Sequence, residues 1–336
     1  MRIPSKVVVL AAVAVVLCAT PVSAVPAVHS VAIGLDVPWE IEFLPDGSAL
    51  FTERDTLKLK KLASNGLVTT VQTVGAEVGD ERGLLGLAVS PNYAADGTVF
   101  VYYTTDVDSR VARLVLGGKP EPIVTGIPVA RNHNGGGLEF GPDGALYASV
   151  GDNQNAATAQ DLSSLAGKVL RFTTTGEPAP GNPFPNSLVY SYGHRNPEGL
   201  EWVNDRLYAT EFGESETDEL NWIRPGGNYG WPACEGPCGT EGYLDPVVSW
   251  VNDTAGPSGI AFHHDALYIG AVTGRRVLRV PLHGTELGTP EEVLSGYGRM
   301  RAIAPAPDGT LWVGTSNQDS NGTPRPGGDR ILRLRD

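Results

Sequence analysis

The fold of this chain is decided by one stretch, residues 131–147, which reads RNHNGGGLEFGPDGALY. Its second half alternates apolar and polar residues around a Pro-Asp-Gly turn, a strong signal for a β-hairpin. Its first half places one histidine, His133, and three glycines directly before that hairpin. The hairpin recurs along the chain and the histidine does not, so His133 is a candidate for function.

Six copies of the hairpin occur, and each carries an aromatic residue in its second strand: Phe51, Phe100, Tyr147, Tyr208, Tyr268 and Trp312. The spacings of these aromatics run from 44 to 61 residues, which is typical of a blade-type repeat. The sequence therefore predicts an all-β fold, a six-bladed β-propeller of four-stranded antiparallel blades, with each hairpin forming two inner strands. A β-sandwich is the alternative, but it does not explain six equivalent copies.

The two ends of the chain are expected to complete one shared blade, with strands at residues 28–33 and 331–334, because ring closure removes exposed sheet edges. The repeat also predicts where the site lies. Residues just before a first strand and just after a second strand converge on one rim of the central channel. That rim gathers a histidine and at least three arginines in a strongly acidic protein, which suits an anionic ligand.

The N-terminus predicts a secretory signal peptide over residues 1–24, followed by one domain over residues 25–336. Arg2 and Lys6 flank the start of an apolar run that ends near the small-residue signal Val22-Ser23-Ala24. The run is too short to span a membrane comfortably. Its removal takes two positive charges from a net charge of −13, leaving about −15. We expect a secreted protein with no nucleic-acid partner and no membrane insertion.

The three cysteines have different expected fates. Cys18 lies in the leader, and a lipid anchor there is disfavoured because Leu17 stands where a small residue is expected. Cys234 and Cys238 are expected to form a local disulfide in an oxidising compartment. A two-cysteine metal site is the alternative, although no histidine lies close in sequence to complete it.

Several blocks together resemble the soluble pyrroloquinoline-quinone (PQQ) sugar dehydrogenases, the glucose/sorbosone dehydrogenase family. They run in the family's order from about residue 35 onward: GLLG at 83–86, His133 with its glycines, YGHRNPEGL at 192–200, DELN at 218–221, GGNYGWP at 226–232 and RMR at 299–301. The resemblance implies a six-bladed propeller that oxidises the C1 hydroxyl of an aldose to a lactone, with hydride transfer to PQQ held by calcium and arginines. The partners implied are a small sugar and an electron acceptor that the sequence does not identify.

The resemblance also implies roles for individual residues. His133 looks like the general base, since the pKa of an imidazole lies close to working pH. Arg195 looks like the group that polarises the quinone carbonyl, and Asn196 like a cofactor contact. Arg299 and Arg301 look like partners of the cofactor carboxylates.

The metal ligands implied by the resemblance are mostly backbone oxygens. The carbonyls of Gly213 and Glu214 correspond to ligands of the calcium that bridges to the quinone, and oxygen ligands are what calcium requires. Glu219 and the carbonyl of Tyr229 resemble ligands of a second, structural calcium. The alternative for Glu219 is an exposed acidic loop that binds no metal.

Three positions depart from the family pattern. Glu81 stands where a cofactor-contacting glutamine is expected, and its charge could repel an anionic cofactor. Asn132 replaces the aspartate beside the catalytic histidine, where it can still orient His133. Thr273 falls near an expected cofactor-binding lysine.

Other interpretations stay open from the residues alone. The arginines could form structural pairs with Glu81, Glu198 or Glu211, and His194 is expected to be structural. Two other functions are a non-catalytic carbohydrate-binding or scaffold propeller with a decayed redox site, and a metal-dependent lactonase-type hydrolase. The hydrolase needs several carboxylates facing one metal, whereas the predicted rim is rich in arginine.

Overall fold

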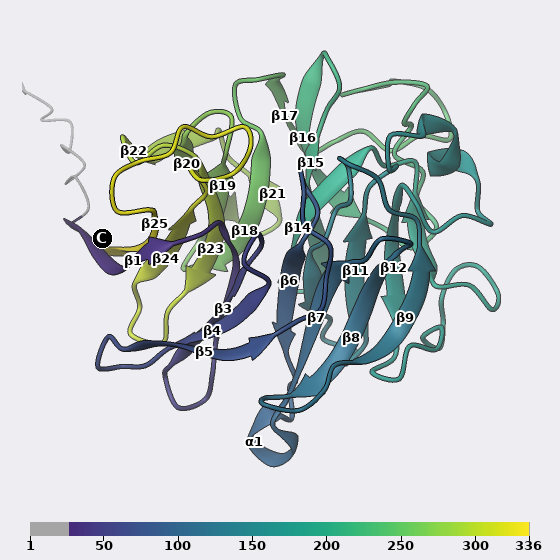
Figure 1. The fold of residues 1–336 in the computed structure, drawn as a ribbon. Helices are drawn as coiled ribbons and strands as arrows, with labels where there is room; N and C mark the ends of the chain where they lie inside the picture. The colour runs from purple at the N-terminus through teal and green to yellow at the C-terminus, as the bar shows by residue number, and fades with distance from the viewer. Residues whose placement is uncertain (1–26, 336) are drawn as a thin grey trace, which may run out of the picture.

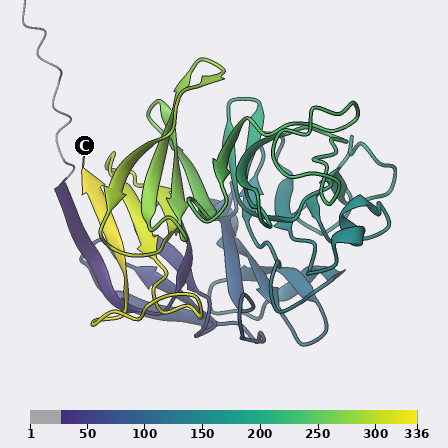
Figure 2. The same ribbon diagram turned by 90° about the horizontal axis from the view of Figure 1, so that it is seen from above.

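The computed structural model describes residues 27–335, and these form a six-bladed β-propeller. The sheets follow one another in chain order around a common centre (Figures 1 and 2). Only α1 (Tyr93–Asp96) and the 3-10 helix η1 (Ala156–Gln160) are helical in this part of the chain. The predicted signal peptide and Cys18 lie outside the described residues. Within them, no helix is long and apolar enough to cross a membrane.

The blades are antiparallel throughout, and each is built from an innermost strand outward. The first blade consists of β2 (Pro38–Phe43), β3 (Ala49–Glu53), β4 (Lys58–Leu62) and β5 (Val68–Thr73). The second consists of β6 (Leu84–Val89), β7 (Thr98–Thr104), β8 (Ser109–Val115) and β9 (Glu121–Ile127). The third consists of β10 (Leu138–Phe140), β11 (Leu146–Val150), β12 (Lys168–Phe172) and β13 (Val189–Tyr192). The fourth blade consists of β14 (Asn196–Val203), β15 (Arg206–Phe212), β16 (Thr217–Ile223) and β17 (Val248–Val251). The fifth consists of β18 (Pro257–His263), β19 (Ala266–Ala271), β20 (Arg276–His283) and β22 (Glu291–Ser295). The sixth consists of β23 (Met300–Pro305), β24 (Leu311–Thr315), β25 (Asp329–Arg335) and β1 (Ala27–Leu35). A two-residue strand, β21 (Glu286–Leu287), also pairs with β20.

The ring closes through the two ends of the chain, as predicted. β1 pairs antiparallel with β25, with Val28 opposite Leu334. In Figure 2 the purple N-terminal strand lies against the yellow C-terminal one. The last blade therefore takes its outer strand from the start of the chain, and opening the ring would break that whole ladder.

Each predicted hairpin forms the two inner strands of a blade. In the third blade, for example, Glu139 pairs with Tyr147 and Phe140 with Leu146. Three of the second-strand aromatics, Phe100, Tyr147 and Trp312, pack against an aromatic residue of the next blade's innermost strand. Phe100 meets Phe140 edge-on at a centroid distance of 5.4 Å, and Tyr147 meets Trp202 at 5.3 Å. The repeated aromatic that identified the blades therefore serves as inter-blade core.

A second repeated contact joins the blades next to the channel, through a hydroxyl on the second strand. Ser149 accepts the N–H of Gly137 in its own blade at 2.9 Å and donates to the carbonyl of Glu198 in the next blade at 2.7 Å. Thr52 and Thr210 make the equivalent pair of bonds in two other blades. Each hydroxyl therefore satisfies two buried backbone groups in neighbouring sheets.

Glycine permits this close approach. A Cβ built on Gly137 would lie 2.0 Å from the carbonyl oxygen of Glu198, and one on Gly199 would lie 2.4 Å from that of Ser258. Any side chain at these positions would push neighbouring inner strands apart. Gly137 and Gly199 of the sequence blocks are thus explained by inter-blade contact.

We expect Thr210→Val to lower the free energy of unfolding by ~1–3 kcal/mol, because it leaves the buried N–H of Gly199 and carbonyl of Ser258 without a partner. Denaturant unfolding of the variant measures the loss. Thr69→Val, on the exposed outer strand β5, is the matched control and should unfold like wild type. Equal stability of the two variants would contradict the role assigned to the hydroxyl.

Candidate active site

The two inner strands of each blade are antiparallel, so the innermost strand begins at the end of the channel where the second strand finishes. This end gathers most of the predicted site residues, which are far apart in sequence. His133 lies before β10, and Asp152 follows β11 in the same blade. Arg195 precedes β14, whereas Arg299 precedes β23.

His133 is held by a carboxylate that sequence reasoning did not select. Its Nδ1 lies 2.7 Å from Oδ1 of Asp152, and Oδ2 of Asp152 accepts the indole N–H of Trp231 at 2.8 Å. Asp152 is almost fully buried, with 2% of its side chain exposed, whereas 16% of the His133 side chain is exposed. A buried carboxylate at Nδ1 favours the tautomer that carries its proton there, which leaves Nε2 as an acceptor.

Asn132 was predicted to orient His133, but the hydrogen-bond partner of the imidazole is Asp152. Within residues 27–335, no hydrogen bond joins the Asn132 side chain to the imidazole. The signal for Asp152 was its position directly after a second strand, in Gly151-Asp152-Asn153, where rim residues are expected. The buried Asn196 accepts the N–H of Gly135 through Oδ1 at 3.1 Å and so fixes the glycine run after His133.

Glu81 contacts the same segment. Its Oε2 accepts the backbone N–H of His133 at 2.7 Å. Burial raises the pKa of Glu81, and the nearby carboxylate of Glu198 raises it further. The shift favours the neutral acid, which would reduce the repulsion between Glu81 and an anionic ligand.

The three predicted arginines each have a carboxylate partner. Arg195 donates through Nε to Oε2 of Glu214 at 2.7 Å. Arg299 donates to Asp319 at 3.0 Å. The rim is therefore a set of matched charges, but of the partners that the structural-pair alternative named, only Glu198 is found, with Arg301.

Arg301 is the most enclosed of these arginines, with only 5% of its side chain exposed. Nη1 donates to Oε2 of Glu198 at 2.6 Å and to Oγ of Ser258 at 2.9 Å. The predicted contact of Arg301 with a cofactor carboxylate would have to compete with this buried pair. Breaking such a pair is costly, because the glutamate would be left without its partner.

Arg195, in contrast, lies at an accessible pair. The Glu214 side chain is 54% exposed, and exposed ion pairs contribute little free energy. The guanidinium also donates to the carbonyl of Phe212 at 3.3 Å and lies 5.8 Å from the ring of Trp231. Arg195 can therefore exchange Glu214 for a ligand at low cost.

Three of the four predicted metal residues, Gly213, Glu219 and Tyr229, line one small cavity of about 10 Å³ together with Glu211, which is about the space of one water molecule or ion. Glu219 lies on β16 and is buried, so the alternative of an exposed loop is wrong. Burial, followed by the charge of Glu211, raises the pKa of Glu219 to about 7. Glu214 does not line this cavity, and its carbonyl accepts from Asn252 at 3.1 Å.

The cavity suits a hard cation for two reasons. Its lining offers oxygen donors, and the charged form of the Glu219 carboxylate, which burial destabilises, would be stabilised by a positive charge. Among residues 27–335, however, no three His, Cys, Asp or Glu side chains are grouped as metal ligands. A cation here would therefore depend on backbone oxygens as well.

Two structural predictions from sequence are confirmed near this cavity. His194 is fully buried between Ser191 Oγ and Glu211 Oε2, each at 2.8 Å, and stacks on Tyr229. Cys234 and Cys238 form a disulfide.

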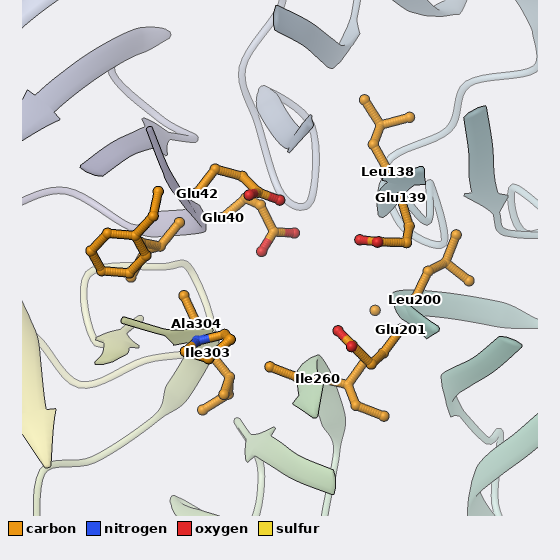
Figure 3. A pocket seen from close by; sticks show the side chains of 14 residues that line it. Glu40, Glu42, Leu138, Glu139, Leu200, Glu201, Ile260, Ile303 and Ala304 are labelled. Atoms are coloured by element: carbon orange, nitrogen blue, oxygen red, sulfur yellow. The ribbon is translucent and has the colours of Figure 1, made fainter. Parts of the chain in front are cut away.

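A second cavity, of about 210 Å³, lies in the channel toward the turn ends of the inner strands. Four glutamates point into it (Figure 3): Glu40, Glu42, Glu139 and Glu201. Burial raises the pKa of Glu42 and of Glu201 to about 8, and it raises the pKa of Glu40 and Glu139 well above the usual range. Glu42, Glu139 and Glu201 each occupy the same position in the first strand of a hairpin. The other three hairpins have alanine at this position.

The fold and the site together define a class: a six-bladed propeller whose channel mouth carries a histidine–aspartate pair beside an arginine with an exposed carboxylate partner. Comparison with known proteins agrees. The family model for glucose/sorbosone dehydrogenases matches residues 35–324, so the chain belongs to the glucose/sorbosone dehydrogenase family.

Individual relatives fit this assignment. The chain is 30% identical to the aldose sugar dehydrogenase YliI of Escherichia coli K12, over 83% of this chain and 87% of the relative. It superposes with a TM-score of 0.89 on the PQQ-bound form of an aldose sugar dehydrogenase from Streptomyces coelicolor, at 45% identity over 92% of this chain and 98% of that one. The apo-form of the soluble aldose sugar dehydrogenase from Escherichia coli gives a TM-score of 0.81 at 26% identity, over 92% and 99% of the two chains.

The channel glutamates predict how stability depends on pH. A carboxyl group whose pKa is raised by folding stabilises the protein at low pH, and this contribution is lost as the pH rises from its unfolded pKa of about 4.3 toward its folded value. The folded pKa of Glu42 is about 8. We therefore expect the melting temperature to fall between these two pH values, and Glu42→Gln to reduce the fall.

Thermal unfolding across this pH range checks the prediction. Glu241→Gln, at an exposed glutamate far along the chain, is the control and should keep the wild-type pH dependence. A Glu42→Gln profile parallel to wild type would mean that the channel carboxyl titrates normally.

Proposed function

We propose that the protein is an exported quinoprotein that oxidises the C1 hydroxyl of aldose sugars to lactones, with PQQ as the hydride acceptor and calcium as its metal. The observation that carries this proposal is the pair of His133 and Asp152, 2.7 Å apart, at the channel mouth near Arg195. Family membership and a PQQ-bound relative support it. The electrons would pass on to an acceptor outside the protein.

His133 has the geometry of a general base. With the Nδ1 proton directed at Asp152, Nε2 is free to accept the proton of a sugar C1 hydroxyl. The buried Asp152 then stabilises the imidazolium that forms and keeps the ring in one orientation. The Trp231 N–H holds the second carboxylate oxygen, so Asp152 itself has little freedom to move.

Bound PQQ would supply an electrophilic quinone that accepts the hydride. Arg195 is the residue best placed to hold it, because its partner Glu214 is exposed and exchangeable. Arg299 and Arg301 would contribute positive charge from their buried pairs, and Asn196 would keep the glycine run in place. A neutral Glu81 would resemble the glutamine expected at that position.

We expect His133→Gln to bind PQQ nearly as well as wild type but to turn over aldoses roughly 10²–10⁴ times more slowly, since the imidazole acts in the transition state. Titration of the apo-protein with PQQ and calcium measures binding, and dye reduction with an aldose panel measures turnover. Asn65→Gln, on an exposed turn, is the control for expression and folding. Wild-type protein that shows no saturable PQQ binding would refute the quinoprotein proposal and leave a carbohydrate-binding propeller.

Calcium should stabilise the fold through the cavity lined by Glu219 and Tyr229. A ligand that binds only the native state raises the melting temperature by mass action. Chelator should therefore lower the melting temperature of wild type, and Glu219→Ala should abolish this response. A chelator effect of the same size in both proteins would assign calcium to another site.

A further inference from the structure

A short loop, residues 234–238, contacts three parts of the candidate site and is closed on itself by the Cys234–Cys238 disulfide. We propose that this loop is a clamp that positions the cofactor-binding rim, with Glu235 as the positioning residue. The inference rests on the proposed function, because the rim that it positions is the one proposed to hold the quinone and calcium.

The first contact is made by the Glu235 carboxylate. It accepts the backbone N–H groups of three consecutive residues, Glu214, Ser215 and Glu216. The distance to Ser215 N is 3.1 Å and that to Glu216 N is 2.7 Å. Consecutive N–H groups that converge on one carboxylate form a strong anion-binding arrangement. This arrangement fixes an exposed turn between β15 and β16.

That turn carries the groups that surround Arg195. The guanidinium donates to the side chain of Glu214 at 2.7 Å and to the carbonyl of Phe212 at 3.3 Å. Gly213, between them, lines the small cavity proposed for calcium. Glu235 accepts only backbone N–H groups of this turn, so it acts on Arg195 through the position of the turn's backbone.

The other two contacts come from the backbone of the loop and from its disulfide. The N–H of Gly236 donates to Oε1 of Glu219 at 2.6 Å. The disulfide packs on Gly230, where an added Cβ would lie 2.5 Å from Sγ of Cys234. The next residue, Trp231, donates to Asp152. One loop thus touches the turn beside Arg195, the carboxylate of the small cavity and the segment that holds Asp152.

The test compares Glu235→Ala, Glu235→Gln and the double variant Cys234→Ala/Cys238→Ala. Glu241→Gln is the control, because Glu241 is an exposed glutamate a few residues beyond the loop. Two measurements are made: hydrogen exchange of the amides of residues 214–216 in the apo-protein, and titration of the apo-protein with PQQ in the presence of calcium. Melting temperature and turnover at saturating PQQ are recorded for each variant.

For Glu235→Ala we expect exchange of these amides to rise by about tenfold or more, and PQQ affinity to fall by a similar factor, as three charge-assisted hydrogen bonds are lost. Glu235→Gln keeps one acceptor oxygen and should be intermediate. The double-cysteine variant should resemble Glu235→Ala. Because Glu235 contacts neither His133 nor Asp152, Glu235→Ala should lose more in PQQ affinity than in turnover at saturating PQQ.

Unchanged amide exchange in Glu235→Ala would overturn the clamp whether or not PQQ binds. Faster exchange with unchanged PQQ affinity would show that the turn does not position the cofactor, which also overturns the inference. A fall in melting temperature without a change in affinity would assign the loop a structural role only. Wild-type protein that binds no PQQ would instead refute the proposed function, and the exchange data would still report on the hydrogen bonds of Glu235.

Discussion

The close contact between the inner strands of neighbouring blades is the constraint on which the rest of the structure depends. A hydroxyl from one blade bonds to the backbone of the next, and glycine at the same level lets the strands approach. In the three blades that have this hydroxyl, Thr52, Ser149 and Thr210, the contact holds the inner strands together beside the channel. His133, Arg195 and Arg301 come from separate blades, and the closed ring of blades places them at one end of the channel.

The arginines at the channel mouth are paired with carboxylates because most of these side chains are buried. A buried guanidinium or carboxylate without a partner is strongly destabilising, and the enclosed pair of Arg301 and Glu198 obeys this rule. The pair of Arg195 and Glu214 is accessible and can therefore be exchanged for a ligand. The acidic residues are also divided between two regions: Glu81 and Asp152 lie beside His133, whereas the four channel glutamates lie toward the opposite end.

The sequence predicted the fold well because the repeat is local. A turn that contains aspartate, alternating residues and an aromatic in the second strand specify each hairpin within about 15 residues. The closing of the ring by residues 28–33 was predicted because it removes exposed sheet edges, and the disulfide because an exported protein reaches an oxidising compartment. His133 and Arg195 were selected because they interrupt the repeat at equivalent positions.

Partners that depend on three-dimensional contact were harder to predict. The position of Asp152 directly after a second strand is consistent with the rim, but its pairing with His133 depends on the turn of the chain after β11. The carboxylates that form ion pairs with Arg299 and Arg301 come from other segments of the chain. Glu235, which accepts hydrogen bonds from the turn beside Arg195, also comes from another segment. Alternation showed that Glu42, Glu139 and Glu201 differ from their apolar neighbours, but not that they share a channel.

The central claim is that His133 and Asp152 promote transfer of the C1 hydrogen of an aldose to a bound quinone. It is tested most directly by mixing PQQ-loaded protein with glucose and with C1-deuterated glucose, in a single turnover, and recording the quinone absorbance. We predict that the loss of oxidised-quinone absorbance is proportional to the amount of PQQ-loaded protein. We also predict that the loss is several-fold slower with C1-deuterated glucose than with glucose. A quinone signal that neither these sugars nor a broad aldose panel can change would contradict it.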